Sequence, residues 1–291
     1  SGSYRSNGFM APLARRAVSR FRDGRTTTRP PSRPTFRSLP GVRHGMARIS
    51  VLDDDVSLDE PTLVEGFPGV GLVGKIATDH LIETHEMVHY ANVHCEGLPR
   101  VAVYRESDPS LTAPVRLYAD PERDLVALRS DVPVNPGAAT EVAGCLDDWF
   151  VETAVFPIFL SGLGREKDET PPDLYGVATG DGADALSLAE ISEPPESGLV
   201  SGPTGAMLAE SLERDRDAVG LVVESDPQFP DPEAARVLIR DGIDPIADIE
   251  TSTDGLVEQA EEIRNAKQAF AKRMQEATEE SSQAEPLKMF Q

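Results

Sequence analysis

The sequence contains very little cysteine and no long apolar run. Only Cys95 and Cys145 occur among 291 residues, and neither belongs to a Cys-x-x-Cys pair. Two cysteines are too few for a scaffold built on disulfides, and the chain is long enough to bury a full hydrophobic core instead. No run approaches about 18 consecutive apolar residues, the length of a membrane-spanning helix. We therefore predict a soluble globular protein with no membrane partner.

Lysine is also scarce, because only 5 of the 28 basic residues are lysine. The formal net charge is -22, and residues 1–45 hold ten arginines against the single acid Asp23, so the remainder carries -31. A body this acidic repels polyanions, which argues against nucleic acid as a partner. Dense acidic charge is screened in concentrated salt. We interpret the chain as a cytoplasmic protein of a halophile.

The composition divides the chain into four parts. Residues 1–45 are rich in Arg, Ser and Pro and are expected to be disordered. Two alternatives have the same composition: a targeting peptide, and an extension that precedes a natural start at Met46. Residues 46–254 alternate β-rich and helical runs, which predicts one α/β domain. Residues 255–280 predict a C-terminal helix that packs on its own domain or on another subunit. Residues 281–291 predict a flexible polar tail with an apolar tip.

Several runs within the domain have clear periodicity. Helices are predicted at 71–83, 137–154, 201–215 and 231–242. Strands are predicted at 62–67, 100–105, 114–119, 125–130, 155–164, 174–180 and 218–225. The runs at 114–119 and 125–130 are expected to form a hairpin.

The stretch EGFPGVGLVGKIA, residues 65–77, fits two phosphate-binding patterns at once. Gly69-x-Gly71-x-x-Gly74 has the spacing of a dinucleotide-binding turn, and Gly69 to Lys75 has the frame of a P-loop. A P-loop needs a Ser or Thr after its lysine to bind Mg²⁺, and Ile76 stands there. Glycine also serves sharp turns that bind nothing, because it lacks a Cβ. An alternative remains a nucleoside-type enzyme or ligand-binding protein that uses the loops near Gly66, Gly162 and Gly202.

The stretch HEMVH, residues 85–89, matches a zinc-protease pattern, with His85 and His89 as ligands and Glu86 as base. That chemistry needs a helix, which places residues four apart on one face. The preceding helix is expected to end near Thr84, and MVHYANVHC is rich in strand-forming residues. We therefore predict no metal site here, and a metalloprotease is the less favoured alternative.

The run GFPGVGLVG resembles the signature of the proteasome assembly chaperone family, in its archaeal branch. LPRVAVY (98–104), SGPTGAML (201–208), VGLVVES (219–225) and PDPEAARVLI (230–239) follow in the order typical of that family. The resemblance covers about residues 46–280. It implies a three-layer α/β sandwich similar to nucleoside phosphorylases, with a helical C-terminal part. It also implies a homo-oligomer that has no cofactor, catalyses no reaction and assists assembly of the proteasome α ring.

The resemblance also assigns roles to two groups of residues. It implies that the motif residues form a tight strand-to-helix turn: Gly66, Phe67, Pro68, Gly69, Gly71 and Gly74. Some archaeal members end in a hydrophobic residue, a tyrosine and any residue, and this tail docks between proteasome α subunits. Met289, Phe290 and Gln291 match these positions, with phenylalanine in place of tyrosine. We therefore predict that these three residues bind the partner.

Overall fold

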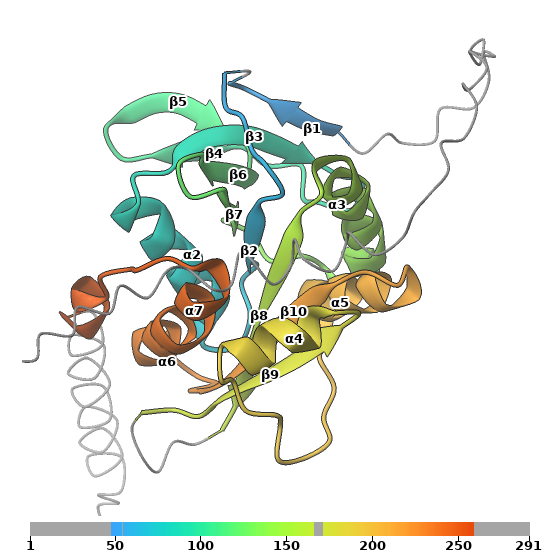
Figure 1. The fold of residues 1–291 in the computed structure, drawn as a ribbon. Helices are drawn as coiled ribbons and strands as arrows, with labels where there is room; N and C mark the ends of the chain where they lie inside the picture. Colours follow the sequence, from blue (N-terminus) through green and yellow to red (C-terminus); the bar gives the residue numbers. More distant parts are fainter. Residues whose placement is uncertain (1–47, 54, 166–170, 259–291) are drawn as a thin grey trace, which may run out of the picture.

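The fold is built on one large mixed sheet (Figure 1), seen in a computed structural model that describes residues 48–53, 55–165 and 171–258. The strand order is β1-β3-β6-β7-β2-β8-β10-β9. The four central strands run parallel: β7 (Leu125–Ser130), β2 (Thr62–Gly66), β8 (Phe156–Gly164) and β10 (Ala218–Ser225). Antiparallel pairing adds β6 (Val115–Asp120), β3 (Val88–His94) and β1 (Arg48–Val51) on one side and β9 (Leu174–Thr179) on the other.

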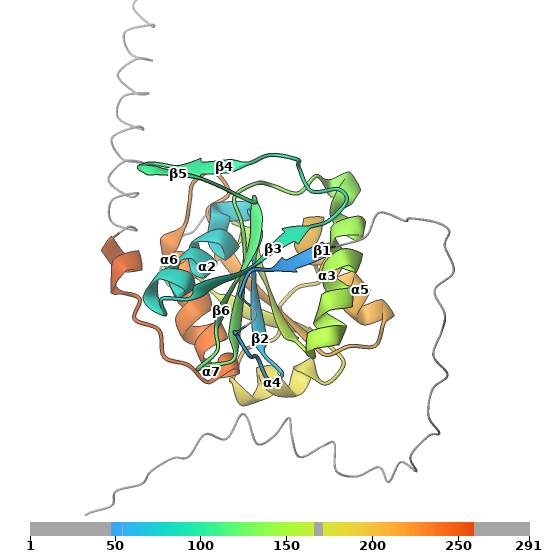
Figure 2. The ribbon, with the colours of Figure 1, turned by 90° about the horizontal axis from the view of Figure 1, so that it is seen from above.

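Helices cover both faces of the sheet (Figures 1 and 2). One face carries α2 (Val73–Thr84), α4 (Gly182–Leu188), α6 (Pro232–Val237), the π-helical turn η4 (Leu238–Ile243) and α7 (Asp244–Ala247). The other face carries α3 (Ala139–Thr153), which follows the 3-10 turn η3 (Pro136–Ala138), and α5 (Gly202–Glu213). The three-layer α/β prediction is confirmed. The likeness to nucleoside phosphorylases stays a prediction.

The central strands are apolar on both sides because both sides are covered. On β7, Leu125 and Ala127 belong to the core under α2, whereas Val126 and Leu128 belong to the core under α3. All four side chains are fully buried. Such continuous apolar runs are typical of strands in the middle of a three-layer sheet.

The local predictions succeed where the periodicity is strong. The expected hairpin is formed by β6 and β7, with Asp120 paired to Leu125. The strand expected at 100–105 is shorter than predicted, because only β4 (Val103–Arg105) is extended. It pairs with β5 (Asp108–Thr112) in a separate two-stranded sheet. Strand β5 was not predicted, because Pro109 and its polar neighbours are typical of a turn. Helix α4 was not predicted either.

Cys95 and Cys145 form a disulfide between the residue after β3 and helix α3. Their Cα atoms lie 5.9 Å apart, and fifty positions separate them in sequence. Both side chains are buried in the core under α3. No spacing pattern around the two cysteines predicted this bond.

The other predictions concern the ends of the chain. The predicted C-terminal helix begins at residue 254 and is helical to residue 258, the last described position. The rest of 255–280, the tail 281–291 and the extension 1–45 lie outside the described residues. Within the part that the structure covers, no helix is long and apolar enough to cross a bilayer.

Candidate functional site

The glycine-rich motif connects β2 to α2 through the 3-10 turn η2 (Val70–Leu72). Gly66 is the last residue of β2, and Val73 is the first residue of α2. The backbone reverses at Gly71 and Leu72, whose φ angles are 61° and 53°. Glycine adopts this left-handed conformation without the steric cost that other residues carry. The turn therefore depends on the glycine at position 71.

The motif glycines differ in how closely other atoms approach them. A Cβ at position 66 would lie 2.0 Å from Thr78 Oγ1, and one at position 71 would lie 1.8 Å from Ser225 Oγ. Nothing lies within 4 Å of a Cβ at Gly69, and a Cβ at Gly74 would make ordinary contacts. Only Gly66 and Gly71 are required by the packing. They bring α2 close to β2 and bring the turn close to the end of β10.

The turn lies across the ends of neighbouring strands. A Cβ at Gly162, near the end of β8, would lie only 2.5 Å from the Val70 carbonyl oxygen. The Asp231 amide donates to the Gly71 carbonyl at 2.8 Å. Open α/β sheets bind their ligands outside the carboxyl ends of the parallel strands. Here the backbone of η2 contacts those ends itself, so this arrangement does not favour a phosphate site.

Glu65 fixes the start of the turn from inside the protein. Its carboxylate accepts hydrogen bonds from the Phe67 amide at 2.6 Å, the Leu160 amide at 3.3 Å and the Thr204 hydroxyl at 3.0 Å. The side chain is fully buried, and this burial raises the pKa of Glu65 to about 7 despite the three donors, which lower it. Thr204 belongs to the SGPTG stretch. Glu65 therefore joins two stretches that the resemblance singled out separately.

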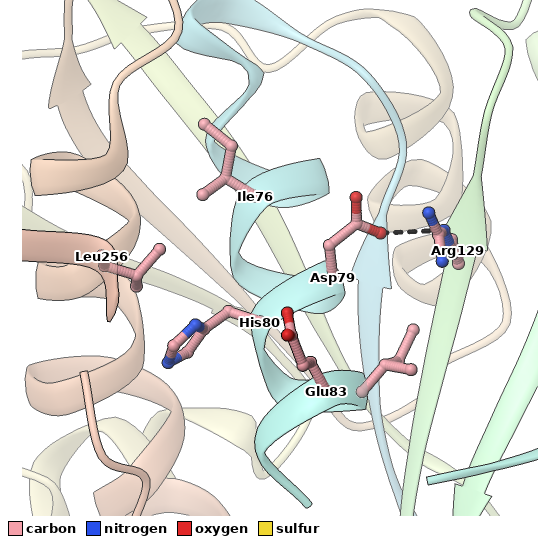
Figure 3. Close-up of a pocket in the computed structure, with 7 residues that line it drawn as sticks. Ile76, Asp79, His80, Glu83, Arg129 and Leu256 are labelled. Carbon is pink, nitrogen blue, oxygen red and sulfur yellow. Dashed lines mark ion pairs between the residues drawn. The ribbon is translucent and has the colours of Figure 1, made fainter. Parts of the chain in front are cut away.

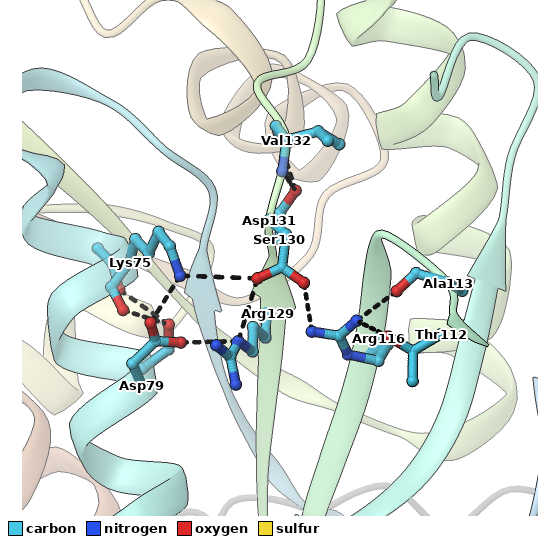
Figure 4. A network of polar contacts seen from close by, with 11 residues as sticks. Lys75, Asp79, Thr112, Ala113, Arg116, Arg129, Ser130, Asp131 and Val132 are labelled. Carbon is cyan, nitrogen blue, oxygen red and sulfur yellow. Dashed lines mark hydrogen bonds and ion pairs between the residues drawn. The ribbon is translucent and has the colours of Figure 1, made fainter. Parts of the chain in front are cut away.

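Lys75, the lysine of the P-loop frame, is held in ion pairs (Figure 4). Its Nζ lies 2.6 Å from Asp79 Oδ2 and 3.8 Å from Asp131 Oδ1. Arg129 Nε lies 2.9 Å from Asp79 Oδ1 and 3.5 Å from Asp131 Oδ1. Lys75 therefore crosslinks the first turns of α2 to the end of β7, as a structural cation would.

The same network continues to the root of the β4–β5 hairpin (Figure 4). Arg116, fully buried on β6, pairs with Asp131 Oδ2. It also donates to the Thr112 hydroxyl at 3.0 Å and to the Ala113 carbonyl. Thr112 is the last residue of β5. A buried guanidinium needs such partners to be stable, and here Nη1 and Nη2 have them whereas the buried Nε has no hydrogen-bond partner. The network thus ties α2, β7 and the base of the hairpin together.

A cavity of about 370 Å³ lies beside α2, at the start of the C-terminal helix (Figure 3). It is lined by Ile76, Asp79, His80, Ile82, Glu83, Arg129 and Leu256. Asp79 and Arg129 are paired with each other, as the dashed line in Figure 3 shows. Leu256 is almost fully buried. The cavity therefore marks the seam between the domain and the C-terminal helix.

The histidines of the HEMVH stretch have separate surroundings. His85 follows the last residue of α2, and His89 lies within β3, so they do not share a helix. His85 Nε2 lies 3.0 Å from Thr251 Oγ1, and His89 Nε2 lies 3.0 Å from Asn92 Oδ1. Burial lowers the pKa of both histidines. Among residues that the structure describes, no group of three His, Cys, Asp or Glu side chains could hold a metal ion.

The candidate residues are therefore distributed unequally. The structure brings Gly66, Phe67, Pro68, Gly69, Gly71 and Gly74 together in one turn, whereas Met289, Phe290 and Gln291 lie outside the described residues. Glu65 and the disulfide were missed by the sequence reasoning. Glu65 carried one usable signal, a single acid within the apolar strand 62–67. An isolated acid in such a strand is costly to bury unless donors surround it.

Comparison with known proteins gave a consistent set of similarities. A sequence model described as the PAC2 family matches residues 63–271. An uncharacterised protein of Methanocaldococcus jannaschii is 24% identical over 235 residues, which cover 80% of this chain and 94% of that one.

Two solved structures from Pyrococcus furiosus have similar folds. One is PbaA, described as an archaeal homolog of proteasome-assembly chaperone, with a TM-score of 0.68, 21% identity, and coverage of 81% of this chain and 96% of that chain. The other is PbaB, described as an archaeal proteasome activator, with a TM-score of 0.67, 22% identity, and coverage of 78% and 100%.

Proposed function

This chain belongs to the PAC2 family, and from that membership we propose that it is a non-catalytic, proteasome assembly chaperone-like protein that binds proteasome α subunits. The observation that carries the proposal is the family match over residues 63–271. Similar folds in a protein described as a homolog of proteasome-assembly chaperone and in one described as a proteasome activator support it.

The proposed contact is made by the C-terminal tail. Residues 281–286 are polar and include Pro286, a composition typical of a tether, and Leu287, Met289 and Phe290 give its end an apolar character. Met289 and Phe290 would contribute buried apolar area in a pocket between α subunits, and Gln291 would lie at the rim of that pocket. Such a contact is weak alone and is strengthened when several tails of one oligomer bind together.

A truncation tests the tail. Deleting residues 289–291 should abolish binding to purified proteasome α subunits in concentrated salt, measured by co-sedimentation. Phe290→Ala should weaken binding strongly, whereas Phe290→Tyr should preserve or strengthen it because tyrosine keeps the ring. Light scattering of the same samples should give an unchanged oligomer size. Equal binding by the truncated and full-length proteins would exclude the tail as the docking element.

The alternative of a nucleoside-type enzyme receives less support from the geometry. The η2 turn contacts the ends of β8 and β10, where an α/β enzyme of this class would hold its ligand. Lys75, the cation that a phosphate would need, is engaged by Asp79 and Asp131. A binding protein is the function that this arrangement favours.

We further propose that the protein is a homo-oligomer of a halophile's cytoplasm. The acidic composition supports this setting, since salt screens repulsion between the acids. The melting temperature should therefore fall when salt is reduced from molar to low-millimolar concentration, and an unchanged value would contradict the proposal. The Cys95–Cys145 disulfide is uncommon for a cytoplasmic protein. Thiol labelling of protein taken directly from native cells would show whether that bond exists there.

A further inference from the structure

The β4–β5 hairpin projects from the body and has little contact with it (Figures 1 and 2). Its two strands pair only with each other, in a sheet separate from the central one. Every residue from Arg100 to Leu111 is exposed except Val103, which is half-buried. A two-stranded hairpin alone is at best marginally stable in water. The distal part of this hairpin therefore lacks the packing that normally keeps such a structure ordered.

The root of the hairpin is firmly held. Arg116 donates to Thr112 and Ala113 and is itself fixed by Asp131, so the last residue of β5 is bound to the body by a buried cation. Val103 pairs with Thr112 across the strands just above this anchor. The hairpin is thus presented in a defined direction, which lowers the conformational entropy lost when it binds a partner.

The free part of the hairpin carries apolar side chains. The relative exposure of Tyr104 is 80%, that of Leu111 is 69% and that of Val101 is 51%. Tyr104 lies next to Val103 on β4 and Leu111 lies next to Thr112 on β5, so both flank the Val103–Thr112 pair, where the register of the two strands shifts. Single exposed apolar residues are common on protein surfaces, but tyrosine is enriched at the centres of protein interfaces. The hairpin and its approach thus expose three apolar side chains on one projecting element, which a protein partner can cover.

The charge of the hairpin indicates which protein covers it. Within residues 98–114, Arg100 and Arg105 balance Glu106 and Asp108, whereas the whole chain has a net charge of -22. Two copies of such an acidic molecule repel each other over most of their surfaces. A neutral segment is where they can meet at low electrostatic cost. A segment with both signs can also pair with its own copy, as a symmetric contact requires.

We propose that the β4–β5 hairpin is a contact between copies of this chain, with Tyr104 and Leu111 at its centre. The inference rests on the homo-oligomer of the proposed function and identifies the surface that forms it. The hairpin is smaller than the 20 to 30 residues a side of a typical stable interface, so it forms the apolar centre of a larger contact. The partner surface is part of a second copy, and the proteasome-binding tail is separate from it.

Two substitutions and a matched control test the contact. Tyr104→Ser and Leu111→Ser should each raise the dissociation constant for self-association about tenfold or more, measured by analytical ultracentrifugation of the full chain in molar salt. Leu199→Ser is the control, because Leu199 is a fully exposed leucine outside the hairpin. It should leave self-association unchanged. Circular dichroism should show that all three variants remain folded, since none of these side chains is buried.

A second measurement uses the unmodified protein. Hydrogen exchange of the amides of residues 101–111 should be slow at high protein concentration and become faster on dilution into the dissociated state. Three results would each overturn the proposal. They are a wild-type protein that is monomeric at all concentrations, hairpin variants that associate as strongly as the wild type, and hydrogen exchange that does not change on dilution. Binding to α subunits is measured separately through the tail deletion. If the hairpin variants self-associate normally but the tail deletion abolishes α-subunit binding, the hairpin proposal is wrong and the proposed function is supported. If the hairpin variants lose self-association but the tail deletion leaves α-subunit binding unchanged, the hairpin proposal is supported and the tail is excluded as the docking element.

Discussion

Replacing Gly71 with alanine tests the packing of the glycine turn most directly. Residue 71 has a φ angle of 61°, and its Cβ would lie 1.8 Å from Ser225 Oγ and 3.2 Å from the Asp226 carbonyl oxygen. The substitution therefore adds backbone strain and a collision with a fully buried neighbour. Gly69→Ala is the matched control, because a Cβ there meets nothing within 4 Å.

The expected loss of stability combines two effects. A left-handed conformation costs a residue other than glycine roughly 1–2 kcal/mol. Forcing an extra carbon into a packed site costs about 1–3 kcal/mol. Together they predict that Gly71→Ala lowers the free energy of unfolding by about 2–5 kcal/mol, or by about 6–12 °C in melting temperature for a loss near 3 kcal/mol. Gly69→Ala should change the free energy of unfolding by less than about 1 kcal/mol.

Urea denaturation at one fixed high salt concentration measures both variants. The double variant Gly71→Ala/Ser225→Ala removes the Oγ atom and should recover about 1 kcal/mol or more of the loss, whereas the backbone strain should remain. Ser225 Oγ is buried without a hydrogen-bond partner, so Ser225→Ala alone should be close to neutral. Equal free energies of unfolding for Gly71→Ala and Gly69→Ala would refute this account of the turn.

Three further predictions concern ligands, metals and pH. Lys75→Ala should lose at most about 1 kcal/mol of stability, since its ion pairs are partly exposed, and calorimetry should detect no ATP–Mg²⁺ binding that depends on Lys75. Elemental analysis should find far less than one zinc per chain, and one zinc lost on His85→Ala would revive the protease interpretation. Folding raises the pKa of Glu65 from 4.5 to about 7, so the folded state binds more protons between these values and the free energy of unfolding should fall by about 3 kcal/mol as the pH rises through this interval. The difference between wild type and Glu65→Gln in denaturation at pH 5 and pH 8 isolates this effect, and identical pH dependence of the two proteins would contradict it.

Local patterns predicted the elements that are regular and buried. The apolar runs at 62–67, 125–130, 155–164 and 218–225 predicted the four central strands, because strands covered on both sides need continuous apolar sequence. Strand β5, and with it the β4–β5 hairpin, escaped prediction for the opposite reason, although a strand was expected at 100–105. It is exposed, so burial imposes no alternating pattern on it, and Pro109 resembles a turn residue.

The sequence by itself determined the α/β class, the end of α2 beside Thr84 and the incompleteness of the P-loop and zinc motifs, since these depend on residues close together in the chain. Only the tertiary structure decided which motif glycines are constrained, because Thr78 and Ser225 approach Gly66 and Gly71 through the packing of separate elements. It also decided that Glu65 is buried between Leu160 and Thr204, and that Lys75 and Arg116 share Asp131. These contacts join residues from 12 to 154 positions apart, and no periodicity in a sequence records which side chains of separate elements will meet.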